Sequence, residues 1–213
     1  MYGILNSFTL VLLGYLLNSV YGYNLCVVGA GSGLGRELVY QAITNRNMSV
    51  LALTSKKSIR EPFRGDGYED NENTPLIMNP LLDIDNYWKH IKSDYDALVI
   101  CTGGKPFEDD YSDILTEKFL EHLSEKCTDV SVVSAYSVNN DSLEKFSIPF
   151  QIMGNFYLKD TYRAKRKQEE LLKTYDTLPI RKKLFTPRAL SYGKTVLPST
   201  TREDLAKEIL DAI

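Results

Sequence analysis

Four glycines alternate with other residues after a short apolar run, at Gly29, Gly31, Gly33 and Gly35. The preceding residues, 25–28, are all apolar, and the residues that follow place apolar side chains at helical spacing. Glycines let the backbone turn tightly and approach a phosphate, and the N–H groups at a helix start face an anion. A strand, a glycine turn and a helix in this order are typical of sites that bind a dinucleotide pyrophosphate. A tight turn without a ligand is the alternative interpretation.

The spacing of the glycines indicates which type of nucleotide-binding loop this segment could form. Leu34 occupies the position of the third glycine in the common G-x-G-x-x-G pattern, so that pattern is not formed. Gly29, Gly33 and Gly35 form G-x-x-x-G-x-G instead. Such a loop alone is a weak indication of a nucleotide site, but its position between an apolar strand and an amphipathic helix strengthens the prediction.

Hydroxyl and lysine side chains end the second apolar run, 49–54, and follow it. The sequence there is Thr54-Ser55-Lys56-Lys57. Proteins that select the cofactor without a 2′-phosphate place an acidic residue at this point, where it accepts the ribose hydroxyls. Hydroxyl and ammonium groups suit a phosphate on the ribose. We therefore predict that the chain binds NADP(H) in preference to NAD(H), with solvated loop lysines as the alternative.

Strand-like and helix-like segments alternate along the chain. The strand-like segments are continuous apolar runs, as expected where helices cover both faces of a sheet. After residues 25–28 they are 49–54, 75–78, 96–102, 130–134 and 184–186. Besides the helix after the glycines, the helix-like segments are 83–93, 112–127, 161–174 and 202–213. The alternation predicts an α/β fold with one doubly wound parallel sheet, whose strand ends share the edge where ligands bind.

Composition argues against several functional classes. The 213 residues favour one domain, and a net charge of −3 with mixed signs gives no indication of a nucleic-acid partner. The three cysteines, Cys26, Cys101 and Cys127, have no metal-ligand spacing, and two of them lie in predicted strands. We expect buried thiols, with neither a disulfide framework nor a metal site.

The first residues differ from the rest of the chain. No charged side chain precedes Arg36, and residues 8–17 form an apolar stretch shorter than the ~20 residues of a membrane span. We expect residues 1–22 to be an apolar leader, either a signal peptide or a membrane anchor. Residues 23–213 would form the domain, with a flexible polar loop at 56–73. This favours the ER and secretory route or membrane association; an extra packed helix and a cytoplasmic location are the alternatives.

The glycine segment resembles the nucleotide loop of short-chain dehydrogenases/reductases. Later segments resemble the atypical, NmrA-like branch of that NAD(P)-binding Rossmann superfamily, which is related to biliverdin and flavin reductases. The matching segments are 96–100, 132–134, 164–172, 186–190 and 201–206, in the family's order. The resemblance implies a Rossmann-type domain that is shorter at its C-terminus than is usual in the family.

The resemblance also implies a cofactor pocket. The implied ligands of the pyrophosphate are Gly29, Gly31, Ser32, Gly33, Leu34 and Gly35, and those of the 2′-phosphate are Thr54, Ser55 and Lys56. Thr102 and Gly103 would lie along the nicotinamide ribose, with Ser134 beside the nicotinamide. Lys165 would bind the ribose hydroxyls, because an ammonium can donate to two of them. Glu169, one turn later, is expected to pair with this lysine on the helix surface.

The proton donor is the point at which the sequence departs from the family. Catalytic members place a tyrosine four residues before the lysine, and Thr161 stands there in this chain. Tyr162 is three residues before Lys165, and one residue turns a side chain by about 100° around a helix. We therefore expect Ser134, Lys165 and Tyr162 as the catalytic set, with water or Tyr136 as other proton sources. Half-buried aromatic packing is the alternative for both tyrosines.

Two functions remain open at this point. The first is a reductase that passes hydride from NADPH to a small acceptor such as a quinone, a flavin or a carbonyl compound. The second is a module that senses or binds NADP(H) without catalysis, which the displaced tyrosine favours. A methyltransferase would share the fold outline, but lysines stand where such enzymes need a ribose-binding carboxylate.

Overall fold

The computed structural model describes the chain in several ranges. They are residues 23–31, 33–54, 76–77, 94–103, 111–135, 138, 148, 151, 156–176, 179–187, 190–191 and 200–213. Several predictions lie outside these residues. They concern the leader 1–22, the loop 56–73, the helix 83–93, and Ser32, Ser55, Lys56 and Tyr136.

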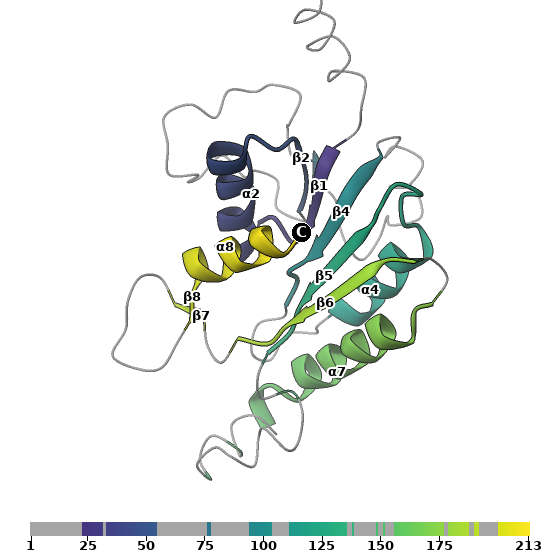
Figure 1. Cartoon of the computed structure of the whole chain (residues 1–213). Coiled ribbons are helices and arrows are strands. Elements are labelled where there is room, and N and C mark those ends of the chain that lie inside the picture. The colour runs from purple at the N-terminus through teal and green to yellow at the C-terminus, as the bar shows by residue number, and fades with distance from the viewer. Residues whose placement is uncertain are drawn as a thin grey trace, which may run out of the picture.

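A parallel sheet forms the centre of the fold (Figure 1). Among the described residues its strands are β1 (Tyr23–Val28), β2 (Val50–Thr54), β3 (Leu76–Ile77), β4 (Tyr95–Ile100), β5 (Asp129–Val133) and β6 (Arg181–Phe185). They lie in the order β3-β2-β1-β4-β5-β6, and all neighbours run parallel. This is the strand order of the doubly wound Rossmann fold, so the predicted fold class is confirmed.

The strand order reverses between β1 and β4, which lie side by side at the centre of the sheet. From β1 the chain moves outward to β2 and β3, and then returns to β4 on the opposite side of β1. β1 pairs with β2 up to Val28↔Leu53 and with β4 up to Val28↔Ile100. In open sheets of this kind, ligands bind beyond the carboxyl ends of the strands at this switch point. The residues that follow β1, β4 and β5 therefore form the edge to examine for a site.

Helices cover both faces of the sheet (Figure 1). They are α2 (Gly33–Arg46), α4 (Ser112–Glu121), α7 (Lys159–Thr174) and α8 (Arg202–Ala212). α2 and α8 pack together over one face, and α4 and α7 pack together over the other. The Thr201 hydroxyl caps α8 by accepting from the Asp204 N–H at 3.0 Å. None of the described helices has the length and apolar character needed to cross a membrane.

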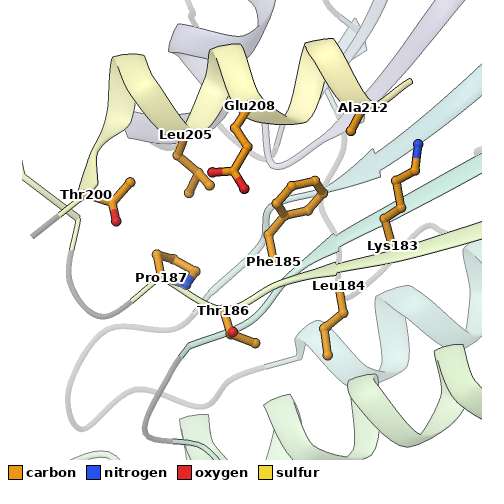
Figure 2. A pocket seen from close by; sticks show the side chains of 9 residues that line it. All are labelled: Lys183, Leu184, Phe185, Thr186, Pro187, Thr200, Leu205, Glu208 and Ala212. Carbon is orange, nitrogen blue, oxygen red and sulfur yellow. The ribbon is translucent and has the colours of Figure 1, made fainter.

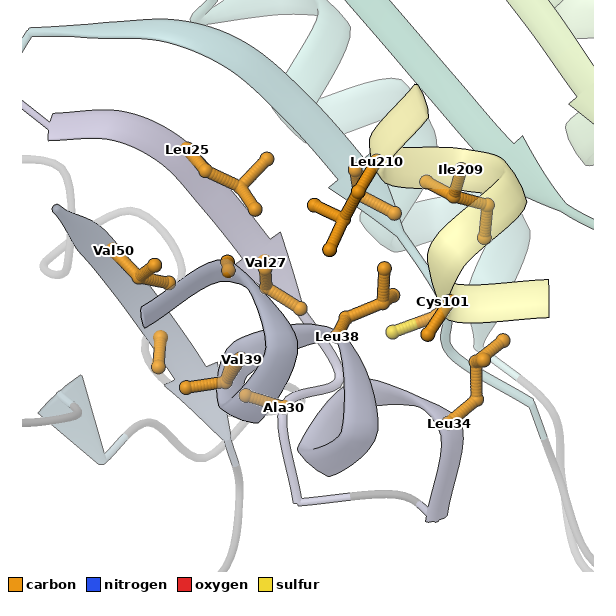
Figure 3. Packing of buried hydrophobic residues seen from close by; sticks show 14 of the residues in the cluster. Leu25, Val27, Ala30, Leu34, Leu38, Val39, Val50, Cys101, Ile209 and Leu210 are labelled. Carbon is orange, nitrogen blue, oxygen red and sulfur yellow. The ribbon is translucent and has the colours of Figure 1, made fainter. Parts of the chain in front are cut away.

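Alternate residues of β1 point into the two cores, which explains why its apolar run has no polar position. Leu25 and Val27 pack under α2 and α8, with Leu38 of α2 among their neighbours (Figure 3). Cys26 and Val28 belong to the opposite core, beneath α4 and α7. A strand segment buried on both faces needs apolar side chains at every position, and residues 25–28 of β1 have them.

Several predicted element boundaries differ from those in the structure. The strand predicted at 184–186 is β6, which begins earlier, at Arg181, because its basic side chains have an acidic partner. The carboxylate of buried Asp129 forms ion pairs with the Arg181 guanidinium (N···O 2.6 Å) and the Lys183 ammonium (N···O 3.6 Å). These ion pairs allow charged residues to form the first part of the strand. The helix predicted at 112–127 ends at Glu121. It is followed by a turn in which the Cys127 N–H donates to the Ser124 carbonyl at 2.9 Å.

The other differences concern the start of α7 and the short strands β7 and β8. α7 begins at Lys159, two residues before the predicted start. β7 (Leu190–Ser191) and β8 (Thr200–Thr201) form a short parallel pair that the sequence did not predict. Two-residue strands are too short to produce a recognisable periodic pattern.

The three cysteines are buried thiols, as predicted, and none of them forms a disulfide with another described residue. Burial raises the pKa of the Cys26 thiol well above its ordinary value. Burial also raises the pKa of Cys127 to about 11, and its Sγ donates to the Asp129 carbonyl at 3.3 Å. A thiol with a raised pKa carries little thiolate at neutral pH, so both side chains are structural.

We predict that Gly35→Ala lowers the free energy of unfolding by about 2 kcal/mol, because the methyl group overpacks immovable backbone. A Cβ at this position would lie 2.2 Å from the Gly29 carbonyl oxygen and 2.8 Å from the Ala30 Cα. Urea unfolding measures the change. Gly103→Ala is the matched control, since among the described residues its Cβ would meet only the Lys165 Cε, at 4.0 Å. Equal midpoints for the two variants would contradict the packing argument.

Candidate functional site

The glycine turn after β1 is built from backbone contacts. Gly29 has a φ of 88°, a conformation that glycine adopts without strain. The N–H groups of Gly29 and Ala30 both donate to the Leu53 carbonyl, at 3.0 and 2.9 Å, which fastens the turn to β2. On the other side, a Cβ at Gly29 would lie 3.1 Å from the Thr102 nitrogen. The end of β1 therefore lies tightly between the ends of its two neighbours.

The start of α2 lies directly beyond this turn. The helix begins at Gly33, and its first turn carries Arg36 and no acidic residue. Its N–H groups and the positive end of the helix dipole favour an anion at this position. Leu34 is buried within the core (Figure 3), so it can offer a ligand only its main chain. Gly31 is buried within the same turn. This geometry fits a diphosphate.

Lys165 joins α7 to the carboxyl ends of two strands. Its side chain is only 5% exposed. The ammonium donates to the Thr102 carbonyl, to the Val133 carbonyl at 2.9 Å, and to the Gln168 Oε1 at 2.9 Å. The first two acceptors follow β4 and end β5, so one side chain fixes both strand ends. Gly103 lies beside this side chain, since a Cβ added to the glycine would be 4.0 Å from the Lys165 Cε.

Two buried hydroxyls lie next to these carbonyls. The Thr102 Oγ1 and the Ser134 Oγ are buried and have no hydrogen-bond partner within the part of the chain that the structure describes. The Ser134 N–H donates to the Phe185 carbonyl at 2.8 Å, which fixes its backbone to β6. A buried hydroxyl without a partner costs about 1–3 kcal/mol, so such groups usually serve a ligand or a water molecule. Both would suit the hydroxyls and the carboxamide of a nicotinamide riboside.

The expected partner of Lys165 on its own helix is different in the structure. Glu169 is not on the helix surface: it is 2% exposed, and its Oε1 has no hydrogen-bond partner among the described residues. Gln168, three residues after Lys165, accepts from the ammonium instead. The predicted surface position of Glu169 is therefore wrong. Sequence reasoning missed Gln168, whose only signal was its i, i+3 spacing from Lys165.

Tyr162 lies in a small apolar cluster. It is 7% exposed and packs with Val138, and Ala135 and Leu158 border the same cluster. The alternative interpretation of this tyrosine, as a packed aromatic, describes this position, and its role as a proton donor stays a prediction. Tyr157 precedes α7 and is 49% exposed.

The residues predicted at the 2′-phosphate are only partly described. Thr54 is the last residue of β2; it is 3% exposed and pairs with Ile77 of β3. Ser55 and Lys56 lie outside the described residues. The structure thus places the end of β2 at the expected edge, next to the glycine turn that its Leu53 carbonyl anchors. The preference for NADP(H) stays a prediction.

A cavity of about 690 Å³ lies elsewhere, between β6 and α8 (Figure 2). Phe185, Leu205 and Glu208 are among its lining residues. Phe185 packs against the core under α2 and α8, whereas Lys165 projects from α7 on the opposite face. Among the residues that the structure describes, none of the predicted site residues lines this cavity. No pattern in the sequence indicated it.

Comparisons with known proteins identify the fold. No protein-family model matches the chain, and no curated protein matches it. ChuY, an anaerobillin reductase from Escherichia coli O157:H7, is similar in structure with a TM-score of 0.62 and 14% identity, over 88% of each chain. A short-chain dehydrogenase/reductase from Veillonella parvula in complex with NADP has a TM-score of 0.60 and 13% identity, over 89% of this chain and 86% of that chain.

A third solved structure agrees with these two. A short-chain dehydrogenase/reductase from Vibrio parahaemolyticus has a TM-score of 0.61 and 13% identity, over 88% of this chain and 91% of that chain. At such low identity the similarity concerns the fold. It shows that this chain has the Rossmann fold of these proteins over most of its length.

We predict that Thr102→Val and Ser134→Ala leave the stability of the cofactor-free protein within about 1 kcal/mol, because each removes an unsatisfied buried hydroxyl. Each should weaken binding of NADPH about tenfold if the hydroxyl serves the cofactor. Urea unfolding and isothermal titration measure the two effects. Thr116→Val is the control, because the Thr116 hydroxyl donates to the Ser112 carbonyl at 2.7 Å and its loss should destabilise the protein. A destabilised Thr102→Val with unchanged affinity would contradict the assignment.

Proposed function

We propose that this protein is an NADP(H)-binding oxidoreductase of the atypical, NmrA-like short-chain dehydrogenase/reductase type, which reduces a small acceptor. One observation carries the proposal: the Lys165 ammonium and the unsatisfied hydroxyls of Thr102 and Ser134 gather at the switch point of a Rossmann sheet. They stand beside the glycine turn that follows β1 and the start of α2. A dinucleotide cofactor offers partners for both parts of this edge.

The residues have separate tasks in this proposal. The turn from Gly29 to Gly35 and the start of α2 bind the diphosphate. Thr102 binds the nicotinamide ribose, Lys165 holds the strand ends that carry Thr102 and Ser134, and Ser134 donates to the acceptor or to the carboxamide. The cofactor, when bound, supplies the hydride. Ordered placement of the two reactants is the main contribution of the protein, because a near-attack geometry alone lowers the barrier substantially.

The similar structures support the oxidoreductase class. ChuY is an anaerobillin reductase, and the Veillonella parvula structure is a complex with NADP. The preference of this chain for NADPH rests on Thr54, Ser55 and Lys56 in the sequence. The acceptor is proposed by chemistry: a quinone, a flavin or a carbonyl compound. The apolar residues 1–22 support a secretory or membrane-associated location, with a cytoplasmic one as the alternative.

A second candidate function is an NADP(H)-binding sensor or scaffold without catalysis. The position of Tyr162 favours it, because this side chain is buried among apolar neighbours. Lys165 and the glycine turn would serve a sensor equally well. Only the transfer of hydride separates the two functions.

Anaerobic mixing with NADPH distinguishes the two functions. Reductase activity predicts that NADPH absorbance falls when one member of a panel of quinones, flavins and aldehydes is added. A sensor predicts enhanced nicotinamide fluorescence without oxidation by any member of the panel. If fluorescence and absorbance both stay unchanged, neither proposal holds.

We predict that Gly33→Val abolishes NADPH binding, raising Kd by roughly a hundredfold or more, because a branched side chain enters the diphosphate space at the helix start. Isothermal titration measures the affinity. Asn45→Val, near the end of the same helix, is the control for introducing a β-branched side chain into α2, since Asn45 is exposed. An unchanged affinity for Gly33→Val would remove the site assignment.

We also predict that Lys56→Glu weakens the binding of NADPH at least about tenfold more than that of NADH, because only NADPH carries the 2′-phosphate. Titrations of both cofactors measure the ratio. Lys57→Glu changes the charge equally one residue further and is the control. Equal losses for the two cofactors would show that position 56 does not read the 2′-phosphate.

A further inference from the structure

We propose that Gln168 is a positioning residue: it fixes the Lys165 ammonium against the Thr102 and Val133 carbonyls, and thereby sets the nicotinamide end of the crevice. This inference rests on the proposed function for its catalytic consequence. Its structural part concerns the protein alone. Gln168 does not reach the proposed reacting atoms, so it would act through Lys165.

The carboxamide of Gln168 is the centre of a hydrogen-bond chain between α7 and α4. The side chain is 0% exposed. Its Oε1 accepts from the Lys165 ammonium at 2.9 Å. Its Nε2 donates to the Thr116 Oγ1 at 2.7 Å and lies 3.5 Å from the Ser112 carbonyl. The Thr116 hydroxyl donates in turn to the Ser112 carbonyl at 2.7 Å.

The chain of donors and acceptors allows one orientation of the carboxamide. An ammonium only donates, so the oxygen of Gln168 must face Lys165. The Thr116 proton goes to a carbonyl, so the Thr116 oxygen accepts from the carboxamide nitrogen. Glutamate could accept from the ammonium but could not donate to Thr116. Leucine could do neither. A buried glutamine is therefore the side chain that satisfies both neighbours at once.

The position of the Lys165 ammonium matters because its bonds to the Thr102 and Val133 carbonyls hold the ends of two strands. Lysine is long and flexible, and a buried ammonium needs an acceptor for each proton. Two acceptors are strand-end carbonyls: one belongs to Thr102, and the other, on Val133, directly precedes Ser134. The ammonium thus ties together the backbone that carries the two unsatisfied hydroxyls. Without Gln168 it would lose the bond that links it to α4.

The test compares Gln168→Leu, Gln168→Glu and Thr116→Val with the wild type. Leu172→Ala is the matched control, because Leu172 is buried one turn further along the same helix and its apolar side chain takes no part in the hydrogen-bond chain. In the cofactor-free protein, the ¹⁵N NMR signal of the Lys165 ammonium reports whether its protons are held. We expect a slowly exchanging signal in the wild type, Gln168→Glu and Leu172→Ala, and its loss in Gln168→Leu.

The second readout uses NADPH. We expect Gln168→Leu to lower kcat about tenfold or more, the usual effect of losing a hydrogen bond to a charged group. Nicotinamide fluorescence in the saturated complex should change as well. Kd for NADPH should stay within roughly threefold, because the diphosphate is held at a distant place. Gln168→Glu should recover most of kcat, and Thr116→Val should lie between the wild type and Gln168→Leu.

The outcomes separate the two proposals. If the wild type neither binds nor oxidises NADPH, the proposed function fails, while loss of the ammonium signal in Gln168→Leu still supports the positioning of Lys165. If Gln168→Leu keeps the wild-type ammonium signal, or the wild-type kcat in an active enzyme, the inference is overturned. It is equally overturned if Leu172→Ala lowers kcat as much, because general destabilisation then explains the loss. If Gln168→Leu does not fold, the Thr116→Val variant decides by the same readouts.

Discussion

The close approach of Gly35 to the Gly29 carbonyl is the contact on which the rest of the site depends. No side chain fits between these two residues. As a result α2 begins immediately over the end of β1, and its apolar face reaches the core shared with α8. The same turn is hydrogen-bonded to the Leu53 carbonyl of β2, and at Gly29 it lies close to the main chain of Thr102. Three segments therefore meet through backbone alone, and the shape of the diphosphate cradle is set by the main chain.

A buried charged side chain lies at each end of β5, and the two side chains have different kinds of partner. At the start of β5, Asp129 is matched by two cations of β6, Arg181 and Lys183. At the end of the same strand, Lys165 is oriented by two main-chain carbonyls and an amide. The ion pairs of Asp129 join β5 to β6 at one end of the strand. The hydrogen bonds of Lys165 join α7 to the ends of β4 and β5 at the other end, next to Thr102 and Ser134.

The sequence predicted most of what depends on local pattern. Apolar runs located the central strands, and the alternation of elements indicated the Rossmann topology. Because parallel strands share one edge, Thr102 and Ser134 could be expected near the glycine turn before any contact was known, and the family resemblance added Lys165. The sequence did not predict contacts between elements that are far apart in the chain. The charged start of β6 depends on Asp129, and the choice between Gln168 and Glu169 depends on which side of α7 meets α4. Helical spacing alone does not contain that information.

The position of Tyr162 bears on the chemistry of the proposed acceptor. A residue three before Lys165 lies about 100° around the helix from one four before it, and the Tyr162 side chain packs with Val138 and its cluster. Reduction of an aldehyde or ketone produces a strongly basic alkoxide, which needs an acid within hydrogen-bond reach as it forms. Reduction of a quinone or a flavin produces a delocalised, weakly basic anion, which water can protonate afterwards. A neighbouring donor such as the Ser134 hydroxyl can stabilise that anion. Within the proposed function, the arrangement of this helix therefore favours a quinone or a flavin over a simple carbonyl compound.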